Sequence, residues 1–156
     1  AGRSIPAIFE RDGEAGFREL ETAVLDRIAG WHSLVVATGG GVVTRPVNWG
    51  HLHQGVVVWL DAPTALLLER LRRDATPRPL LATDDPEARL EVLLQARRPL
   101  YAQADLRVEQ QDGDDPTAVA RRVIEALPTI LRDRAQPPEQ PVQLQDSEGQ
   151  LRSSFN

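Results

Sequence analysis

Two short runs of almost continuously apolar residues place the strongest constraint on the fold of this chain. Residues 33–38 read SLVVAT and residues 56–60 read VVVWL, without the regular polar alternation of a strand that has one face in water. A strand that is apolar on both faces is typical of a parallel sheet that is covered by helices on each side. We therefore expect an α/β domain: a three-layer parallel sheet with helices on both faces.

Helical periodicity fills the segments around these runs. Ser4, followed by Ile5 and Pro6, is a typical cap of a short helix, and the apolar spacing predicts a longer helix over 14–29. We also expect helices over 63–73, 86–102 and 116–132, and a short strand at 106–108. Residues 1–132 thus form the predicted domain. Residues 133–156 are rich in Pro, Gln, Ser and Asp, and are predicted to be a disordered tail.

The composition excludes several classes of protein. The net charge is −5, cysteine is absent, and no apolar run approaches the length of a membrane span. We expect no nucleic acid or membrane partner, no disulfide, and a cytoplasmic location. All 18 basic residues are arginine, and methionine is also absent. These absences favour an N-terminally incomplete chain over a complete protein that has lost only its first residue.

A glycine triplet, Gly39-Gly40-Gly41, follows the first apolar run. Ligands of open α/β sheets bind beyond the carboxyl ends of the strands, and glycines there let backbone N–H groups approach a ligand closely. The alternative is a tight turn that requires a positive φ. From the triplet alone, the two interpretations have equal weight.

Three arginine-bearing stretches add candidate chemistry. Arg18 and Glu21 are three residues apart, so they share one helical face, and Arg97 belongs to the sequence RRPLY near a helix end. Arg78 lies in the segment RPLL, in a loop of the kind that closes over a nucleotide. Taken singly, each arginine is better explained as a surface residue or a surface ion pair.

In combination and in this order, these stretches resemble the shikimate kinase family over about residues 2–127. The resemblance implies a P-loop, nucleoside-monophosphate-kinase-like fold and an ATP-dependent, magnesium-dependent transfer of phosphate to the 3-hydroxyl of shikimate, by a monomeric enzyme of aromatic amino-acid biosynthesis. The matching segments are 2–5, 8–9, 13–14, 17–21, 39–41, 78–81 and 97–101.

The resemblance also implies a role for each site residue. Arg18 and Arg97 would hold the shikimate carboxylate, with Glu21 orienting Arg18. Arg78 would be the catalytic arginine that reaches the transferred phosphate, and Arg72 or Arg73 would lie against the nucleotide. Further residues that would contact shikimate are the glycines Gly39, Gly40 and Gly41 and the ring-walling side chains Phe9, Phe17 and Leu80.

One part of the family pattern is missing. The family opens with a strand, a phosphate loop of the form Gly-x-x-Gly-x-Gly-Lys-[Ser/Thr], a helix and a second strand, and the 156 residues contain no such loop and no lysine. We therefore expect the first two strands of the family sheet to be missing from this chain. In the family's 2-3-1-4-5 strand order, the resulting gap between 34–38 and 56–60 is about 10 Å.

We assign no metal ligand in this chain. Asp61 follows an apolar run, as a magnesium-binding acid does, but its place before Pro63 favours a helix cap. His51 and His53 have no third ligand nearby and are predicted to lie at the surface.

Two other functional interpretations remain open. The first is a kinase-like pseudo-enzyme that binds without catalysis. The second is a related small-molecule kinase, for example one that acts on gluconate.

Overall fold

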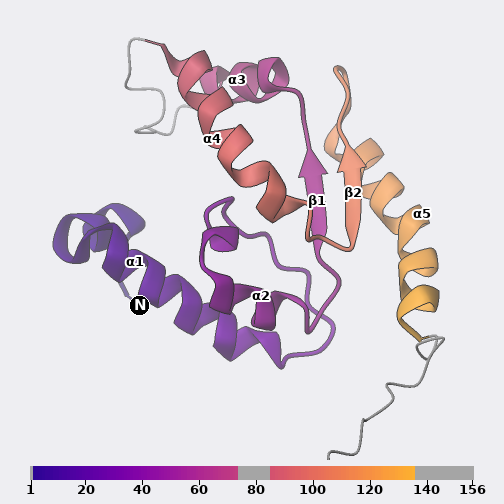
Figure 1. The fold of residues 1–156 in the computed structure, drawn as a ribbon, viewed down its shortest axis with the longest axis horizontal. Helices are drawn as coiled ribbons and strands as arrows, with labels where there is room; N and C mark the ends of the chain where they lie inside the picture. Colours follow the sequence, from indigo (N-terminus) through magenta and orange to yellow (C-terminus); the bar gives the residue numbers. More distant parts are fainter. Residues whose placement is uncertain (1, 74–84, 136–156) are drawn as a thin grey trace, which may run out of the picture.

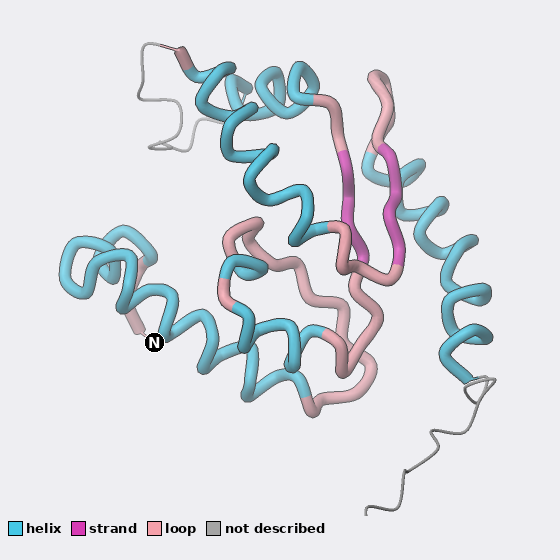
Figure 2. Tube along the Cα trace, in the orientation of Figure 1, coloured by secondary structure: helices cyan, strands magenta, loops and turns pink. Residues whose placement is uncertain are grey.

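The structure is a computed structural model that describes residues 2–73 and 85–135 (Figure 1). Figure 2 shows the strands, in magenta, with helices before, between and after them along the chain. The elements in chain order are α1 (Ile5–Ala29), the 3-10 helix η1 (Val42–Thr44), α2 (Pro46–Leu52), β1 (Val58–Asp61), α3 (Thr64–Arg73), α4 (Pro86–Tyr101), β2 (Leu106–Glu109) and α5 (Pro116–Ala135).

The sheet confirms the predicted α/β class with parallel strands. β1 and β2 pair in parallel, in a register that runs from Val58 opposite Leu106 to Asp61 opposite Glu109. The connection between them contains α3 and α4, since a parallel pair needs a long crossover rather than a hairpin. α5 packs against β2, and α3 packs against α4. Among the described residues the sheet contains these two strands alone.

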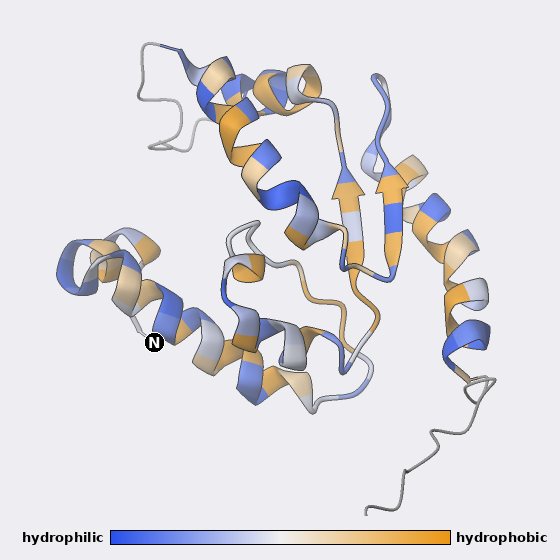
Figure 3. Ribbon diagram, viewed as in Figure 1, coloured by the Kyte–Doolittle hydropathy of each residue, from blue (hydrophilic) through white to orange (hydrophobic). Residues whose placement is uncertain are grey.

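The strand predicted at 33–38 is wrong for this structure. The segment has no regular secondary structure, and its apolar side chains are exposed: Val35 fully, and Leu34 and Val36 by about half. Figure 3 shows these apolar residues along an irregular path between α1 and η1. A strand is stabilised by hydrogen bonds to a neighbouring strand, and within the described residues no strand lies beside this segment. The composition of this segment favours a strand, but the part of the chain that the structure describes offers it no strand partner.

Helix α1 contains the two predicted helices joined at a sharp kink. Ser4 caps its start by accepting a hydrogen bond from the backbone N–H of Ala7 (3.4 Å). Gly13 has φ 68° and ψ −173°, a conformation that interrupts the helix and that glycine adopts without steric cost. The chain folds back there (Figure 1), so the rings of Phe9 and Phe17 stack with their centroids 4.5 Å apart.

The later helices begin and end close to their predicted positions. Asp85 caps α4 by accepting from the backbone N–H of Ala88 (2.9 Å), and Asp115 accepts from Ala118 (2.6 Å) at the start of α5. α5 continues to Ala135, three residues past its predicted end. Residues 136–156 lie outside the described residues, so the disordered tail stays a prediction.

A small apolar core holds the segment after the glycine triplet against α1. Leu25 of α1 packs with Val42, Val43 and Trp49, which belong to η1 and α2. The fully buried Asn48 donates from Nδ2 to the Val42 carbonyl (2.7 Å). This core fixes where the triplet lies relative to α1. No helix in the described part of the chain is both long and apolar enough to cross a membrane.

Candidate functional site

The three glycines form a turn that leads into η1, and none of them needs a positive φ. Gly41, for instance, has φ −84° and ψ −15°, which any residue adopts. The interpretation as a turn that requires glycine conformation is therefore wrong. The lack of room for a side chain explains better why glycine stands at these positions. A Cβ on Gly41 would lie 2.6 Å from Cζ of Arg18, and one on Gly40 would lie 2.8 Å from the Tyr101 hydroxyl.

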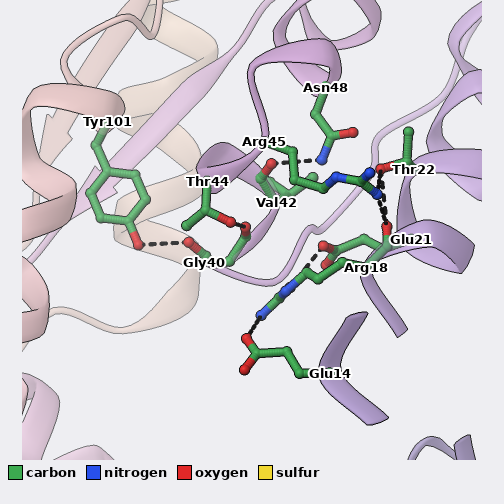
Figure 4. A network of polar contacts seen from close by, with 11 residues as sticks. Glu14, Arg18, Glu21, Thr22, Gly40, Val42, Thr44, Arg45, Asn48 and Tyr101 are labelled. Carbon is green, nitrogen blue, oxygen red and sulfur yellow. Dashed lines mark hydrogen bonds and ion pairs between the residues drawn. The ribbon is translucent and has the colours of Figure 1, made fainter. Parts of the chain in front are cut away.

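Arg18 extends from α1 to this turn and is held there by carboxylates. Its Nη1 lies 2.7 Å from Oε2 of Glu21, and its Nη2 lies 3.6 Å from Oε1 of Glu14 (Figure 4). The predicted contact between Arg18 and Glu21 is confirmed. The guanidinium also lies over the ring of Phe17, 5.2 Å from its centroid. The arginine is thus oriented by one strong ion pair and one aromatic face.

The backbone behind Arg18 is fixed as well. The Arg18 carbonyl accepts a hydrogen bond from Nη1 of Arg45 (2.9 Å) and another from Oγ1 of Thr22 (3.0 Å). The same Arg45 atom lies 3.0 Å from Thr22 Oγ1. Arg45 is the residue before α2, so it links the segment after the glycine turn to α1.

Arg97 approaches the same turn from α4. Its Nη1 is 3.9 Å from the position of a Cβ on Gly40, beside the Tyr101 hydroxyl, which donates to the Gly40 carbonyl at 2.9 Å. Two guanidinium groups from distant helices therefore meet at adjacent glycines. Among the described residues, the amide N–H groups of Gly40 and Gly41 donate to no backbone or side-chain acceptor.

This arrangement suits a small anion that also carries hydroxyl groups. Two planar cations can each donate paired hydrogen bonds to one carboxylate. The free glycine amides supply neutral donors at close range, and the stacked rings of Phe9 and Phe17 supply an apolar wall beside Arg18.

Other predicted site residues lie outside this cluster. Arg72 and Arg73 end α3 and are exposed, and Arg73 pairs with Glu69 of the same helix. Gly39 has only an ordinary contact with the cluster, 3.9 Å from its Cβ position to Glu21 Oε1. Arg78 and Leu80 lie outside the described residues.

The prediction that Asp61 caps a helix is wrong. Asp61 is the last residue of β1, α3 begins at Thr64, and the Asp61 carboxylate accepts from Nε of Arg107 at 2.9 Å. Its other oxygen lies 4.0 Å from Nη2 of Arg98. Asp61 ends β1, so its carboxylate lies beside Arg107 of the neighbouring strand β2, and α3 begins only three residues later.

The described residues do not fit a magnesium site. Asp61 is neutralised by arginine, and among residues 2–73 and 85–135 there is no group of three His, Cys, Asp or Glu side chains that could hold a metal ion. His51 lies near Asp26 (3.5 Å) and His53 near the Gln103 carbonyl (3.3 Å), so the two histidines bind separate parts of the protein.

Two carboxylates with shifted pKa values lie away from the cluster and serve the fold. Burial raises the pKa of Asp105, but the hydrogen bond from the Val57 N–H and the ion pair with Arg134 outweigh it, so the pKa is lowered. The hydrogen bond from the Gln111 N–H lowers the pKa of Asp114, and Arg122 adds to this effect.

Tyr101 and Arg45 belong to the cluster, although neither is among the site residues predicted from the sequence. Tyr101 follows Arg97 by four residues, so helical spacing alone places both on one face of α4. That spacing was the available signal. Nothing local to Arg45 indicates its contact with α1, because the two are 27 residues apart.

Comparison with known proteins identifies the family. The family model described as "Shikimate kinase" matches residues 1–128. The chain belongs to the shikimate kinase family. A shikimate kinase of Synechococcus sp. (strain CC9902) is 61% identical over 133 residues, which cover 85% of this chain and 69% of that protein. The shikimate kinase of Parasynechococcus marenigrum (strain WH8102) is 60% identical over 136 residues, covering 87% and 71%.

Solved shikimate kinases share the fold. The enzyme from Acinetobacter baumannii, solved in complex with shikimate, is 40% identical with a TM-score of 0.72, covering 86% of this chain and 74% of that one. The enzyme from Aquifex aeolicus is 31% identical with a TM-score of 0.66, covering 84% and 74%. The P-loop kinase-like fold class expected from the sequence is therefore confirmed, and the glycine turn with its two arginines belongs to a shikimate kinase.

Proposed function

We propose that this chain supplies the shikimate-binding part of an ATP-dependent shikimate kinase. The observation that carries the proposal is the meeting of Arg18 and Arg97 at Gly40 and Gly41. Shikimate is a ring with one carboxylate and three hydroxyl groups. The two guanidinium groups match the carboxylate, and the free amides of the two glycines match hydroxyl oxygens.

In the proposed reaction, a ring hydroxyl of shikimate attacks the γ-phosphorus of ATP. The new bond joins the 3-hydroxyl oxygen to phosphorus, the bond between phosphorus and the β–γ bridging oxygen breaks, and the hydroxyl loses its proton. The products are 3-phosphoshikimate, ADP and a proton. Phosphoryl transfer depends mostly on positioning and charge stabilisation, and the residues of this chain contribute positioning of the acceptor.

Other parts of the family machinery complete the proposal. Arg78 is proposed to stabilise charge on the transferred phosphate, Leu80 to cover the ring, and Arg72 or Arg73 to lie against the nucleotide. ATP and magnesium are proposed to bind the family's phosphate loop, a motif that these 156 residues do not contain. We further propose that the active enzyme is a cytoplasmic monomer. Shikimate and gluconate each carry one carboxylate, so the two guanidinium groups suit both acids. The stacked rings of Phe9 and Phe17 favour shikimate, because gluconate offers no ring to pack against them.

The test is a chimera in which the opening strand, phosphate loop, helix and second strand of an established shikimate kinase are joined in front of Gly2. We expect release of ADP from magnesium-ATP that depends on added shikimate. Replacement of the loop lysine by alanine is the control and should abolish that release.

Gluconate, supplied at the same concentration, separates the alternatives. Rapid ADP release with gluconate and none with shikimate would assign the chain to a different small-molecule kinase. Tight shikimate binding without any ADP release would favour the pseudo-enzyme.

A further inference from the structure

We infer that Tyr101 is a positioning residue for substrate binding, because its hydroxyl fixes Arg97 of α4 against the glycine turn that also receives Arg18. The inference rests on the proposed function. It concerns how Arg18 and Arg97 are both kept at the glycine turn, although they come from helices that are distant in the sequence.

The contact itself is direct. The Tyr101 hydroxyl donates to the Gly40 carbonyl at 2.9 Å. In Figure 4, Tyr101 and Arg18 approach the glycine turn from opposite sides. Arg97 is one helical turn before Tyr101, so both side chains leave α4 on the same face. A shift of this end of α4 would therefore move Arg97 relative to Gly40 and Gly41.

The end of α4 needs such a tether. Pro99 lies inside the last turn of the helix and has no N–H to donate to the carbonyl four residues earlier, which weakens the turn that carries Arg97 and Tyr101. The hydrogen bond from Tyr101 to Gly40 restrains this weakened turn through a contact outside the helix.

The ring of Tyr101 is itself held in place by a residue of the sheet. It stacks on Trp59 of β1, with the centroids 5.8 Å apart and the planes 28° apart. Arg107 of β2 covers Trp59, with its Cζ 5.0 Å from the ring centroid, and pairs with Asp61. The hydroxyl is therefore presented to the glycine turn by a ring that β1 and β2 keep in place.

The experiment is Tyr101→Phe in the chimera, which removes the hydroxyl and leaves the stacked ring. We expect the KM for shikimate and its Kd by calorimetry to rise about 2- to 12-fold, the range that corresponds to the net effect of one hydrogen bond. The KM for ATP and kcat should change less than twofold.

A double-mutant cycle distinguishes positioning from general stabilisation. If Tyr101 acts through Arg97, then Tyr101→Phe should add no further loss of shikimate affinity in an Arg97→Ala background. The matched control is His53→Ala, which removes another side-chain contact to a carbonyl at this end of α4, that of Gln103. It should leave the KM for shikimate unchanged.

The outcomes are separable. Additive losses in the cycle, or equal changes in the KM for shikimate and for ATP together with a lower Tm, would overturn the positioning role. An active, shikimate-dependent chimera in which Tyr101→Phe changes nothing would overturn it and leave the proposed function standing. A chimera that binds no shikimate would overturn both.

Discussion

At the scale of single residues, Arg18 combines a fixed partner with an exchangeable one. The side chain of Glu21 is 15% exposed and its carboxylate lies 2.7 Å from the guanidinium, whereas the side chain of Glu14 is 74% exposed and its carboxylate is 3.6 Å away. A substrate carboxylate can displace the looser, well-hydrated Glu14 at little cost while Glu21 keeps the guanidinium in its plane. Arg18 is therefore oriented before substrate arrives, and part of its donor capacity stays available.

Removal of either arginine tests its assignment to the carboxylate. Arg18→Ala and Arg97→Ala in the chimera should each raise the KM for shikimate about 10- to 150-fold, because each removes a charge-assisted hydrogen bond of about 1.5–3 kcal/mol. The KM for ATP should change far less. Initial rates with each substrate varied in turn provide the measurement, and Arg11→Ala, an exposed arginine of the same helix, is the control. Equal losses for both substrates would mean that the arginines stabilise the fold instead.

The glycine turn offers a second test at this scale. Gly41→Ala is compatible with the backbone, but its methyl group would displace the flexible guanidinium of Arg18. We expect the KM for shikimate to rise about 3- to 10-fold, a fraction of a charge-assisted bond, with little change in Tm. Gly39→Ala is the matched control, because its methyl group meets nothing closer than 3.9 Å. The two variants behaving alike would contradict this account.

At the scale of elements, α1, α3, α4 and α5 were predictable because their signals are local, whereas α2 was not predicted from the sequence. Ser4 and Asp85 each cap a helix by accepting a backbone hydrogen bond from its first turn, and a proline lies within one residue of the start of each of these four helices. The segment 33–38 carries equally clear strand composition, but a strand depends on a partner elsewhere in the chain, and the described residues provide none.

The same difference between local and long-range contacts determines which contacts of the candidate site were predictable from the sequence. The contact between Arg18 and Glu21 follows from helical spacing and was predicted. The bond from Tyr101 to Gly40 joins residues 61 positions apart, and no local pattern encodes it. That Arg18, rather than turn geometry, requires glycine at position 41 became evident only when the packing was known.

Asp105 provides a test of how elements are joined. Its carboxylate accepts from the Val57 N–H before β1 (2.7 Å) and from Arg134 of α5 (2.7 Å). Its pKa is below the ordinary 3.8 in the folded protein, so the stabilisation is present at neutral pH and is lost as the pH falls through the folded-state pKa. Asp105→Asn should lower the Tm of the chimera at pH 7.

The pH dependence is the decisive part of that measurement. The difference in Tm between the parent chimera and Asp105→Asn should narrow as the pH is lowered below about 4, where the aspartate in the unfolded chain is already protonated. The control is Asp133→Asn, which removes an exposed carboxylate on α5 and should change the Tm at pH 7 less than Asp105→Asn does. A gap in Tm that stays constant from pH 7 to pH 3 would show that the carboxylate charge is not what joins these elements.

At the scale of the whole molecule, the described residues bury little for their number. The sheet has two strands, and a pair of strands is marginal without further strands or extensive helix packing. The apolar side chains of Leu34, Val35 and Val36 face water, and one edge of β1 is unpaired within the described residues. Exposed apolar segments and unpaired edges favour association with other chains.

We therefore expect the 156-residue chain on its own to unfold without a sharp cooperative transition and to release no ADP from ATP. Differential scanning calorimetry with and without shikimate and ATP provides the measurement. The chimera, measured in the same way, should unfold cooperatively, because a strand supplied beside β1 adds ladder hydrogen bonds and buried area. A cooperative transition of the chain alone whose midpoint rises with ATP would contradict this expectation.

The kink at Gly13 in α1 determines the distance between the rings of Phe9 and Phe17, which form the apolar wall beside Arg18. In a straight α-helix, residues eight positions apart are separated by about 12 Å along the axis, so Phe9 and Phe17 would be too far apart to touch. Gly13 converts that rod into a hairpin of two helices and brings the rings to 4.5 Å. An L-residue at this φ and ψ costs about 1–3 kcal/mol and therefore favours the rod. Because glycine has no Cβ, the chain can bend at position 13. The apolar wall beside Arg18 then consists of two stacked aromatic rings instead of one.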